Sequence, residues 1–225
     1  MLPVFADHPL IEQFNELKRY FRRHETSETR ARVEEFREYA RMISLAGLDI
    51  AFDFMGSMNF GQALPRSDVD VVMYLDCHEQ PNDDCGLETS EHFRRAEKTI
   101  LRTLIDTYAD HPYELQVIDC INLSFLKSEI ERGEPDSPIL LRFAFYRSVC
   151  RLVNARLVRP YQLQLQKNTE LTDAMRPHLF TIFDGLCKSS PHTYSLEKYQ
   201  QRLRDMDVTI PASITERIRR HLDGK

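Results

Sequence analysis

The chain has 225 residues, of which 42% are hydrophobic and 29% charged, a composition typical of a globular protein with a substantial core. Its formal net charge of −5 argues against a protein whose main task is to coat nucleic acid, because that binding depends on positive charge. No apolar run reaches the length of a membrane span and the N-terminus lacks a signal-peptide pattern, so we expect a cytoplasmic protein without membrane contact. The 5 cysteines are an odd number without a CxxC pair, which favours reduced thiols over disulfides or a zinc site.

Two amphipathic helices are predicted at the start of the chain. Apolar residues recur at intervals of three and four over 7–23, and again over 28–45, which is the spacing of one helical face. Thr26-Ser27 offers an N-cap for the second helix, and Gly47 ends it. The short apolar stretch 50–55 that follows is typical of a strand.

A glycine-serine turn and an Asp-x-Asp pair follow this strand closely. Gly56 allows the backbone to approach a ligand, and backbone N–H groups beside the Ser57 hydroxyl suit phosphate oxygens. Ser67 then precedes Asp68 and Asp70, which enter an apolar run at 69–75. If this run is a strand, both carboxylates project from one face about 7 Å apart, an arrangement that suits divalent metal ions.

This pattern resembles the signature of the DNA-polymerase-beta-like nucleotidyltransferase superfamily, which includes poly(A) polymerases, CCA-adding enzymes and minimal bacterial nucleotidyltransferases. It combines two residue pairs, a spacing and an apolar strand, whereas a lone DxD would be weak. The alternative is a glycine turn before a half-exposed strand that happens to carry two aspartates. The energetics disfavour that alternative, because like charges on one face repel and Asp is a poor strand former.

The resemblance implies a third metal-binding carboxylate on a neighbouring strand. The β-branched run 113–121 is the predicted strand, and Asp119 is the preferred residue because strand parity places it with Leu115, Val117 and Ile121 on a buried face, where a charge needs a partner. Glu114 is the rival, on the opposite face. Before this strand, 76–91 is predicted to be a surface loop or a flap over the site, and 90–108 an amphipathic helix.

The chain after Ser137 is predicted to be helical. A long apolar helix is expected over 139–158, ended at Pro160, with further helices over 171–187, 195–206 and 211–222. We expect this part to wall the cleft and to contact triphosphate and acceptor through Arg147, Arg151 and Lys167, since Arg suits bidentate phosphate contacts. The alternative is that these cations serve helix solubility and ion pairing.

The predicted fold class is therefore α+β, with a small mixed nucleotidyltransferase sheet, N-terminal helices and a C-terminal helical lobe. The predicted domains are 1–136, the nucleotidyltransferase core with its N-terminal helices, and 137–225, the helical domain. The resemblance implies a two-metal enzyme that transfers a nucleoside monophosphate from a nucleoside triphosphate to an acceptor hydroxyl and releases pyrophosphate.

In that reading Asp68, Asp70 and Asp119 bind Mg²⁺ or Mn²⁺, while Gly56, Ser57 and Ser67 lie at the phosphates. The acceptor stays open between a small molecule, a protein side chain and an RNA end. A different class is also open: a catalytically inactive, nucleotide-binding regulatory or antitoxin-like module.

Overall fold

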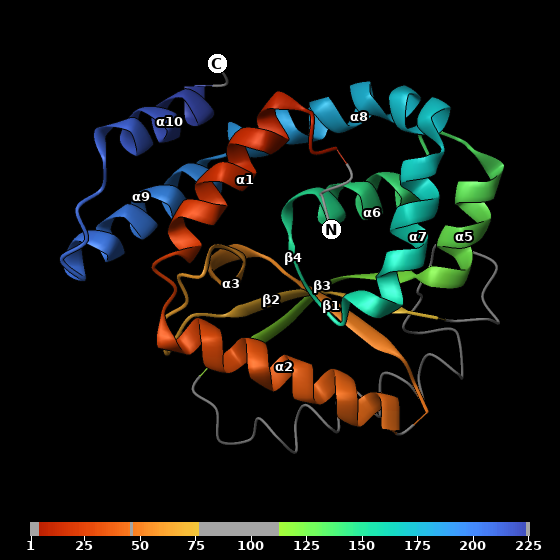
Figure 1. The fold of residues 1–225 in the computed structure, drawn as a ribbon, viewed down its shortest axis with the longest axis horizontal. Coiled ribbons are helices and arrows are strands. Elements are labelled where there is room, and N and C mark those ends of the chain that lie inside the picture. The colour runs from red at the N-terminus through yellow and green to blue at the C-terminus, as the bar shows by residue number, and fades with distance from the viewer. Residues whose placement is uncertain (1–4, 46, 77–112, 224–225) are drawn as a thin grey trace.

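The computed structural model describes residues 5–45, 47–76 and 113–223 of the chain. Its elements follow the order α1 (Pro9–Arg22), α2 (Ser27–Leu45), β1 (Ile50–Phe54), α3 (Gly56–Phe60), β2 (Val69–Leu75), β3 (Leu115–Asn122), α5 (Leu123–Arg132), α6 (Pro138–Val149), β4 (Arg151–Val153), α7 (Ala155–Lys167), α8 (Thr169–Cys187), α9 (Ser190–Asp205) and α10 (Ala212–Asp223). The α+β class predicted from the sequence is confirmed (Figure 1). The predicted helix 90–108, and all but the first residue of the predicted loop 76–91, lie outside the described residues.

The sheet is mixed, with the strand order β3-β2-β1-β4. Strand β1 runs antiparallel to both β2 and β4, whereas β2 and β3 are parallel. Strand β2 therefore has a hydrogen-bonded neighbour on each side. This fixes the position of Asp70, which β2 carries near its start.

Alternate residues of the strands divide the core into two layers. On one face, Phe52 and Phe54 pack edge-on against Phe36 of α2, with ring centroids 5.1 and 4.9 Å from it. On the other face, Val72 and Tyr74 join the apolar side chains of α1, α6 and α8. Figure 1 shows α2 along one side of the sheet and these three helices on the opposite side. Asp70 shares the face of Val72 and Tyr74, because side chains two residues apart point the same way.

Most of the predicted helices and strands are present, but the long helix predicted over 139–158 is wrong. The chain leaves α6 at Val149, and Arg151–Val153 pairs with β1 as an edge strand. Asn154 then adopts a left-handed conformation with φ of 59° and donates a hydrogen bond from Nδ2 to the Ile50 carbonyl at 2.7 Å before α7 begins. Asn tolerates that conformation better than most residues, so it allows the sharp change of direction. Pro160 does not end a helix but lies inside α7.

Helix α9 begins earlier than predicted. Its first residue is Ser190, not Ser195, because the Ser189 side chain accepts the His192 N–H and a proline occupies the first turn, where proline is well tolerated. The domain boundary between 136 and 137 stays a prediction. Strand β4 lies after that boundary and completes the sheet that begins before it. None of the helices in the described ranges is both long and apolar enough to span a membrane.

Candidate active site

The two carboxylates of the Asp-x-Asp pair lie at the start of β2. Asp68 is exposed and Asp70 half-buried, while Val69 between them is buried on the α2 side of the sheet. Asp68 comes directly before β2, and both residues line the same cavity. Burial, and then the negative charge of Asp68, raise the pKa of Asp70. Repulsion between two neighbouring carboxylates and burial both favour the protonated form of Asp70.

Gly56 lies directly against Asp70. The glycine has a φ of +51°, and a Cβ placed on it would be 2.9 Å from Asp70 Oδ2. The Met55 N–H also donates to the Asp70 carbonyl at 2.9 Å, which joins the end of β1 to the start of β2. Only glycine combines this backbone conformation with this close approach, so Gly56, Ser57 and Asp70 form one compact unit.

A cavity of about 430 Å³ opens over this unit. One wall comes from the segment 56–70 and the other from α9, and the cavity is lined by Gly56, Ser57, Leu64, Arg66, Ser67, Asp68, Asp70, Tyr194, Ser195, Lys198, Tyr199 and Arg202. The five motif residues singled out from the sequence thus share one cavity. A wall from the C-terminal helices was expected as well, and α9 supplies it.

The cations of that wall differ from those expected. Lys198 Nζ lies 5.3 Å from the centroid of the Tyr194 ring, and the Arg202 guanidinium carbon 5.6 Å from that of Tyr199. These residues follow a three- and four-residue spacing on one face of α9, so an alternation of aromatic and basic residues was a usable signal in the sequence. Tyr194 is 62% exposed, which leaves its ring accessible in the cavity.

Arg147, Arg151 and Lys167 do not line this cavity. Arg147 is buried and forms an ion pair with Asp53 inside the protein, and Arg151 forms one with Glu25. Lys167 is exposed at the end of α7. The structure therefore does not bring these three cations to Asp68 and Asp70, and the cations that line that cavity are Arg66, Lys198 and Arg202.

A positioning residue that the sequence analysis missed is Arg32 of α2. Its guanidinium donates to the carbonyls of Leu64, Pro65 and Ser67 at 2.9, 2.8 and 2.7 Å. The Ser67 hydroxyl is used within the same turn, because it accepts the Leu64 N–H at 2.9 Å. Arg32 thereby fixes the turn that delivers Asp68. A single Arg in an amphipathic helix carries no sequence signal for this role.

Asp119 lies on the same face of the sheet as Asp70, although not for the predicted reason. A register shift between Val71 and Val72 leaves Ile118 unpaired, so Asp119 stands opposite Val72. The assignment of Asp119 to the face of Leu115 and Val117 is thus wrong, because a bulge reverses strand parity. The bulge nevertheless turns Asp119 towards the α6 side.

The Asp119 carboxylate does not line the cavity of Asp68 and Asp70. Its Oδ2 accepts the Tyr146 hydroxyl at 2.8 Å and lies 3.2 Å from Arg142 Nε. Glu114, the rival, is exposed just before β3, and its carbonyl accepts the Val69 N–H at 2.8 Å. The residue opposite Asp70 on β3 is Gln116.

The carboxylates that line the cavity and could bind a metal ion are therefore those of Asp68 and Asp70. Within 5–45, 47–76 and 113–223, no three His, Cys, Asp or Glu side chains converge as a metal site. Mg²⁺ commonly takes only one or two protein carboxylates and shares its other positions with water and substrate phosphates. Asp68 and Asp70, with the raised pKa of Asp70, fit such an ion.

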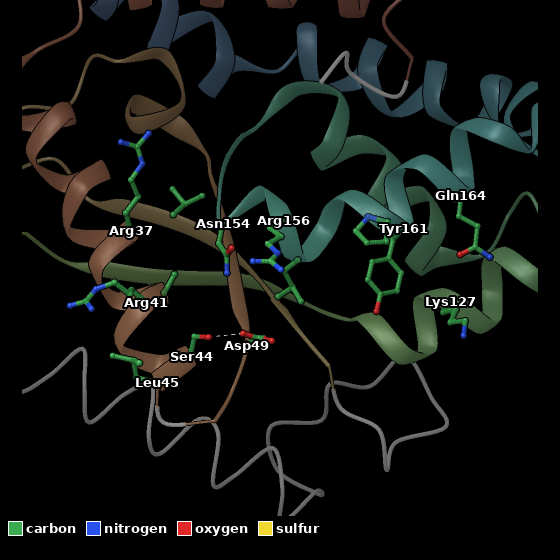
Figure 2. A pocket seen from close by; sticks show the side chains of 14 residues that line it. Arg37, Arg41, Ser44, Leu45, Asp49, Lys127, Asn154, Arg156, Tyr161 and Gln164 are labelled. Atoms are coloured by element: carbon green, nitrogen blue, oxygen red, sulfur yellow. Dashed lines mark hydrogen bonds between the residues drawn. The ribbon is translucent and has the colours of Figure 1, made fainter.

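A larger cavity, of about 950 Å³, lies between α2, β4 and α7 (Figure 2). Of its lining residues, Arg37 and Arg41 are already paired with Glu34 and Glu38 of the same helix. Asp49 is the one carboxylate among those lining residues, and it accepts a hydrogen bond from Ser44 at 2.7 Å. This cavity brings no acidic pair together, so we place the candidate active site at the smaller cavity over Asp68 and Asp70.

Comparisons of the chain with protein-family models, with curated proteins and with solved structures found no match.

Proposed function

We propose that the protein is a metal-dependent nucleotidyltransferase that moves a nucleoside monophosphate from a nucleoside triphosphate to an acceptor hydroxyl and releases pyrophosphate. One observation supports this above the others. Asp68 and Asp70 share a cavity with Gly56 and Ser57 on one wall and with the cations of α9 on the other. Acidic residues for a divalent ion, donors for phosphate oxygens and an exposed aromatic ring are the parts that nucleotide chemistry needs.

Each part has a proposed task. Asp68 and Asp70 hold Mg²⁺ or Mn²⁺, which would polarise the triphosphate and favour deprotonation of the acceptor. The Gly56 backbone and the Ser57 hydroxyl bind phosphate oxygens, and Lys198 and Arg202 offset the charge that gathers on the departing pyrophosphate.

The remaining groups of the α9 wall suit the nucleoside. The exposed Tyr194 ring offers a face on which a base can stack, and such stacking tolerates different bases. Substrate positioning and charge stabilisation are sufficient for this reaction, and no covalent intermediate with the protein is required. The acceptor's oxygen–phosphorus bond forms as the bond to pyrophosphate breaks.

A second candidate is a nucleotide-binding module without turnover. The observation that favours it is the position of Asp119, which is engaged with Tyr146 and Arg142 and does not line the cavity. Transfer by three carboxylates would require Asp119 to exchange these contacts for the cavity. A module that only binds nucleotide has no such requirement.

The deciding experiment is a transfer assay with α-labelled triphosphates and Mg²⁺ or Mn²⁺, screened against small-molecule, protein and RNA acceptors. We expect Asp68→Asn and Asp70→Asn each to lower transfer at least about 100-fold, because even the outer partners of metal ligands commonly contribute 10- to 100-fold. The matched control is Asp136→Asn, an exposed aspartate outside the cavity, which should leave the rate unchanged.

Three outcomes separate the candidates. Metal-dependent transfer that disappears in both cavity variants supports the enzyme. Saturable triphosphate binding that Lys198→Met weakens, without transfer to any acceptor, supports the binding module. Transfer that survives unchanged in Asp70→Asn contradicts both assignments of the cavity. The same assay identifies the third metal-binding residue, which is expected on or next to β3, by comparing Asp119→Asn, Glu114→Gln and Gln116→Ala.

A further inference from the structure

A separate cavity lies on the α1 side of the sheet. It has a volume of about 590 Å³, within the usual range for small-ligand sites, and is bounded by α1, the end of α6, β4 and the start of α7. It shares no lining residue with the cavity over Asp68 and Asp70. We call it the α1 cavity.

The α1 cavity is rich in positive charge, although the chain as a whole is acidic. Lys18, Arg19, Arg22 and Arg147 line it, against one lining carboxylate, Glu12. Three of these cations come from α1 at positions 18, 19 and 22, whose spacing of three and four gathers side chains on one side of a helix. The Arg147 charge is balanced by Asp53 beneath the cavity, but its Nε is buried without a hydrogen-bond partner among the described residues.

Lys18 is the least expected of these groups. It is only 6% exposed, and its Nζ donates to the Val149 carbonyl at the end of α6. No ion pair among the described residues includes Lys18, and the attraction of Asp53 on its charge is weaker than the repulsion from Arg22. Burial, and then the charge of Arg22, lower the pKa of Lys18 to about 7. Buried cations are normally paired, whereas a positive charge on Lys18 is compensated only in part by Asp53.

Arg22 adds a second constrained cation. Its Nε donates to the Asn59 carbonyl at 2.7 Å and a terminal nitrogen donates to Asn59 Oδ1 at 3.0 Å. Burial, and then the charge of Arg151, lower the pKa of Arg22 to about 10. Asn59 belongs to α3, the helix that begins at Gly56, so the α1 cavity and the candidate active site contact the same short helix.

We propose that the α1 cavity binds a small phosphate-bearing anion. Its cations repel one another until an anion enters, and Lys and Arg together supply the point charge and the planar donors that phosphate oxygens accept. The alternative role for Lys18 is structural, as a cap on the last carbonyl groups of α6. That role needs no ligand, so a binding measurement separates the two.

The probe is inorganic pyrophosphate, titrated into the full chain by calorimetry in EDTA and at constant ionic strength, so that metal-dependent binding over Asp68 and Asp70 is suppressed. Ala155 is exposed at the start of α7 and lines the cavity, so substitutions there leave the core intact. We expect Ala155→Glu to weaken binding at least about tenfold by repulsion, whereas the equally long, neutral Ala155→Gln should stay close to the wild type. Lys18→Met should also weaken binding at least about tenfold, and Lys198→Met, in the other cavity, should not.

The proposal is overturned if the wild type shows no saturable binding, if Ala155→Glu and Ala155→Gln bind equally well, or if Lys198→Met abolishes the signal. Circular dichroism and thermal unfolding establish that each variant is folded, and the Ala155 pair decides the result if Lys18→Met unfolds. The assay contains no metal or acceptor, so its outcome is independent of whether the protein transfers nucleotides.

Discussion

Two aspartates on neighbouring strands have different surroundings, and these suit one for stabilising the fold and the other for binding a ligand. Asp53 of β1 and Asp70 of β2 project from the same face of the sheet, since Asp53 pairs with Val72. Asp53 is fully buried, forms an ion pair with Arg147 and accepts the Tyr74 hydroxyl. Asp70 is half-buried, faces a cavity and has Asp68 as its charged neighbour. A compensated buried charge holds the fold together, whereas an uncompensated charge at a cavity is available for a ligand.

The largest effect expected from this comparison is the loss of stability in Asp53→Asn. The substitution leaves the Arg147 charge buried without its partner, and breaking a buried ion pair on one side typically costs about 3–5 kcal/mol. Urea unfolding should show this loss, and the double variant Asp53→Asn/Arg147→Met should recover part of it. Equal stability of the single variant and the wild type would mean that the pair is not a structural element.

The second largest effect is a loss of stability at acidic pH, caused by two histidines that are buried in their neutral form. His192 of α9 and His221 of α10 are hydrogen-bonded through their Nε2 atoms at 2.9 Å. Burial lowers the pKa of each to about 4, and for His221 the neighbouring His192 contributes as well. The unfolded chain binds protons first as the pH falls below about 6.5, so stability is complete above that pH and is lost down to about pH 4.

The loss expected over this pH range is roughly 3 kcal/mol for one histidine. Urea unfolding at pH 7 and pH 4.5 measures it, and His192→Gln should lose less stability on acidification than the wild type. An equal loss in both proteins would show that other groups cause the acid sensitivity.

The parts of the candidate site that the sequence predicted are those that depend on local geometry. Gly56, Ser57, Ser67, Asp68 and Asp70 lie within one turn and one strand start, where alternation and glycine conformation determine their positions. The same holds for most helices, whose apolar spacing is a local signal. The apolar run after Asp68 also predicted strand β2, and the α+β class was predicted as well.

The parts that the sequence did not predict depend on contacts between distant segments. Lys198 and Arg202 reach the cavity only because α9 forms the wall opposite Asp68 and Asp70. The aromatic and basic alternation on α9 is visible in the sequence, but it does not show which part of the chain that helix faces. Strand β4 is three residues long, too short to show a period, and is defined by its pairing with β1. The bulge at Ile118 reversed the parity on which the placement of Asp119 depended.

A comparison of two glycines tests, with a smaller expected effect, whether the close contact between Gly56 and Asp70 matters for the cavity. Gly56 and Gly133 both have positive φ, of 51° and 76°, but only at Gly56 would a Cβ meet another residue, namely Asp70 Oδ2. Gly56→Ala and Gly133→Ala should each lose about 1–2 kcal/mol from backbone strain. Only Gly56→Ala should also weaken Mg²⁺-dependent triphosphate binding, because it displaces Asp70. Equal binding in the two variants would show that the contact with Asp70 is unimportant for the cavity.

The smallest expected effect is a gain of stability in Asp70→Asn at neutral pH. The folded-state pKa of Asp70 is raised above its ordinary value of 3.8 by burial and by Asp68, so its contribution to stability is complete below that pH and is lost as the pH rises through the folded-state pKa. At pH 7 the ionised carboxylate therefore destabilises the wild type relative to the neutral amide. The gain should not exceed about 1 kcal/mol, since a half-exposed carboxylate keeps much of its hydration. In urea unfolding, the free energy of unfolding of Asp70→Asn should be higher than that of the wild type at pH 7 and equal to it near pH 4. Asp136→Asn is the exposed control. Mg²⁺ should raise the unfolding temperature of the wild type but not that of Asp70→Asn. If Asp70→Asn is instead less stable than the wild type at pH 7, the Asp70 carboxylate stabilises the fold, as that of Asp53 does.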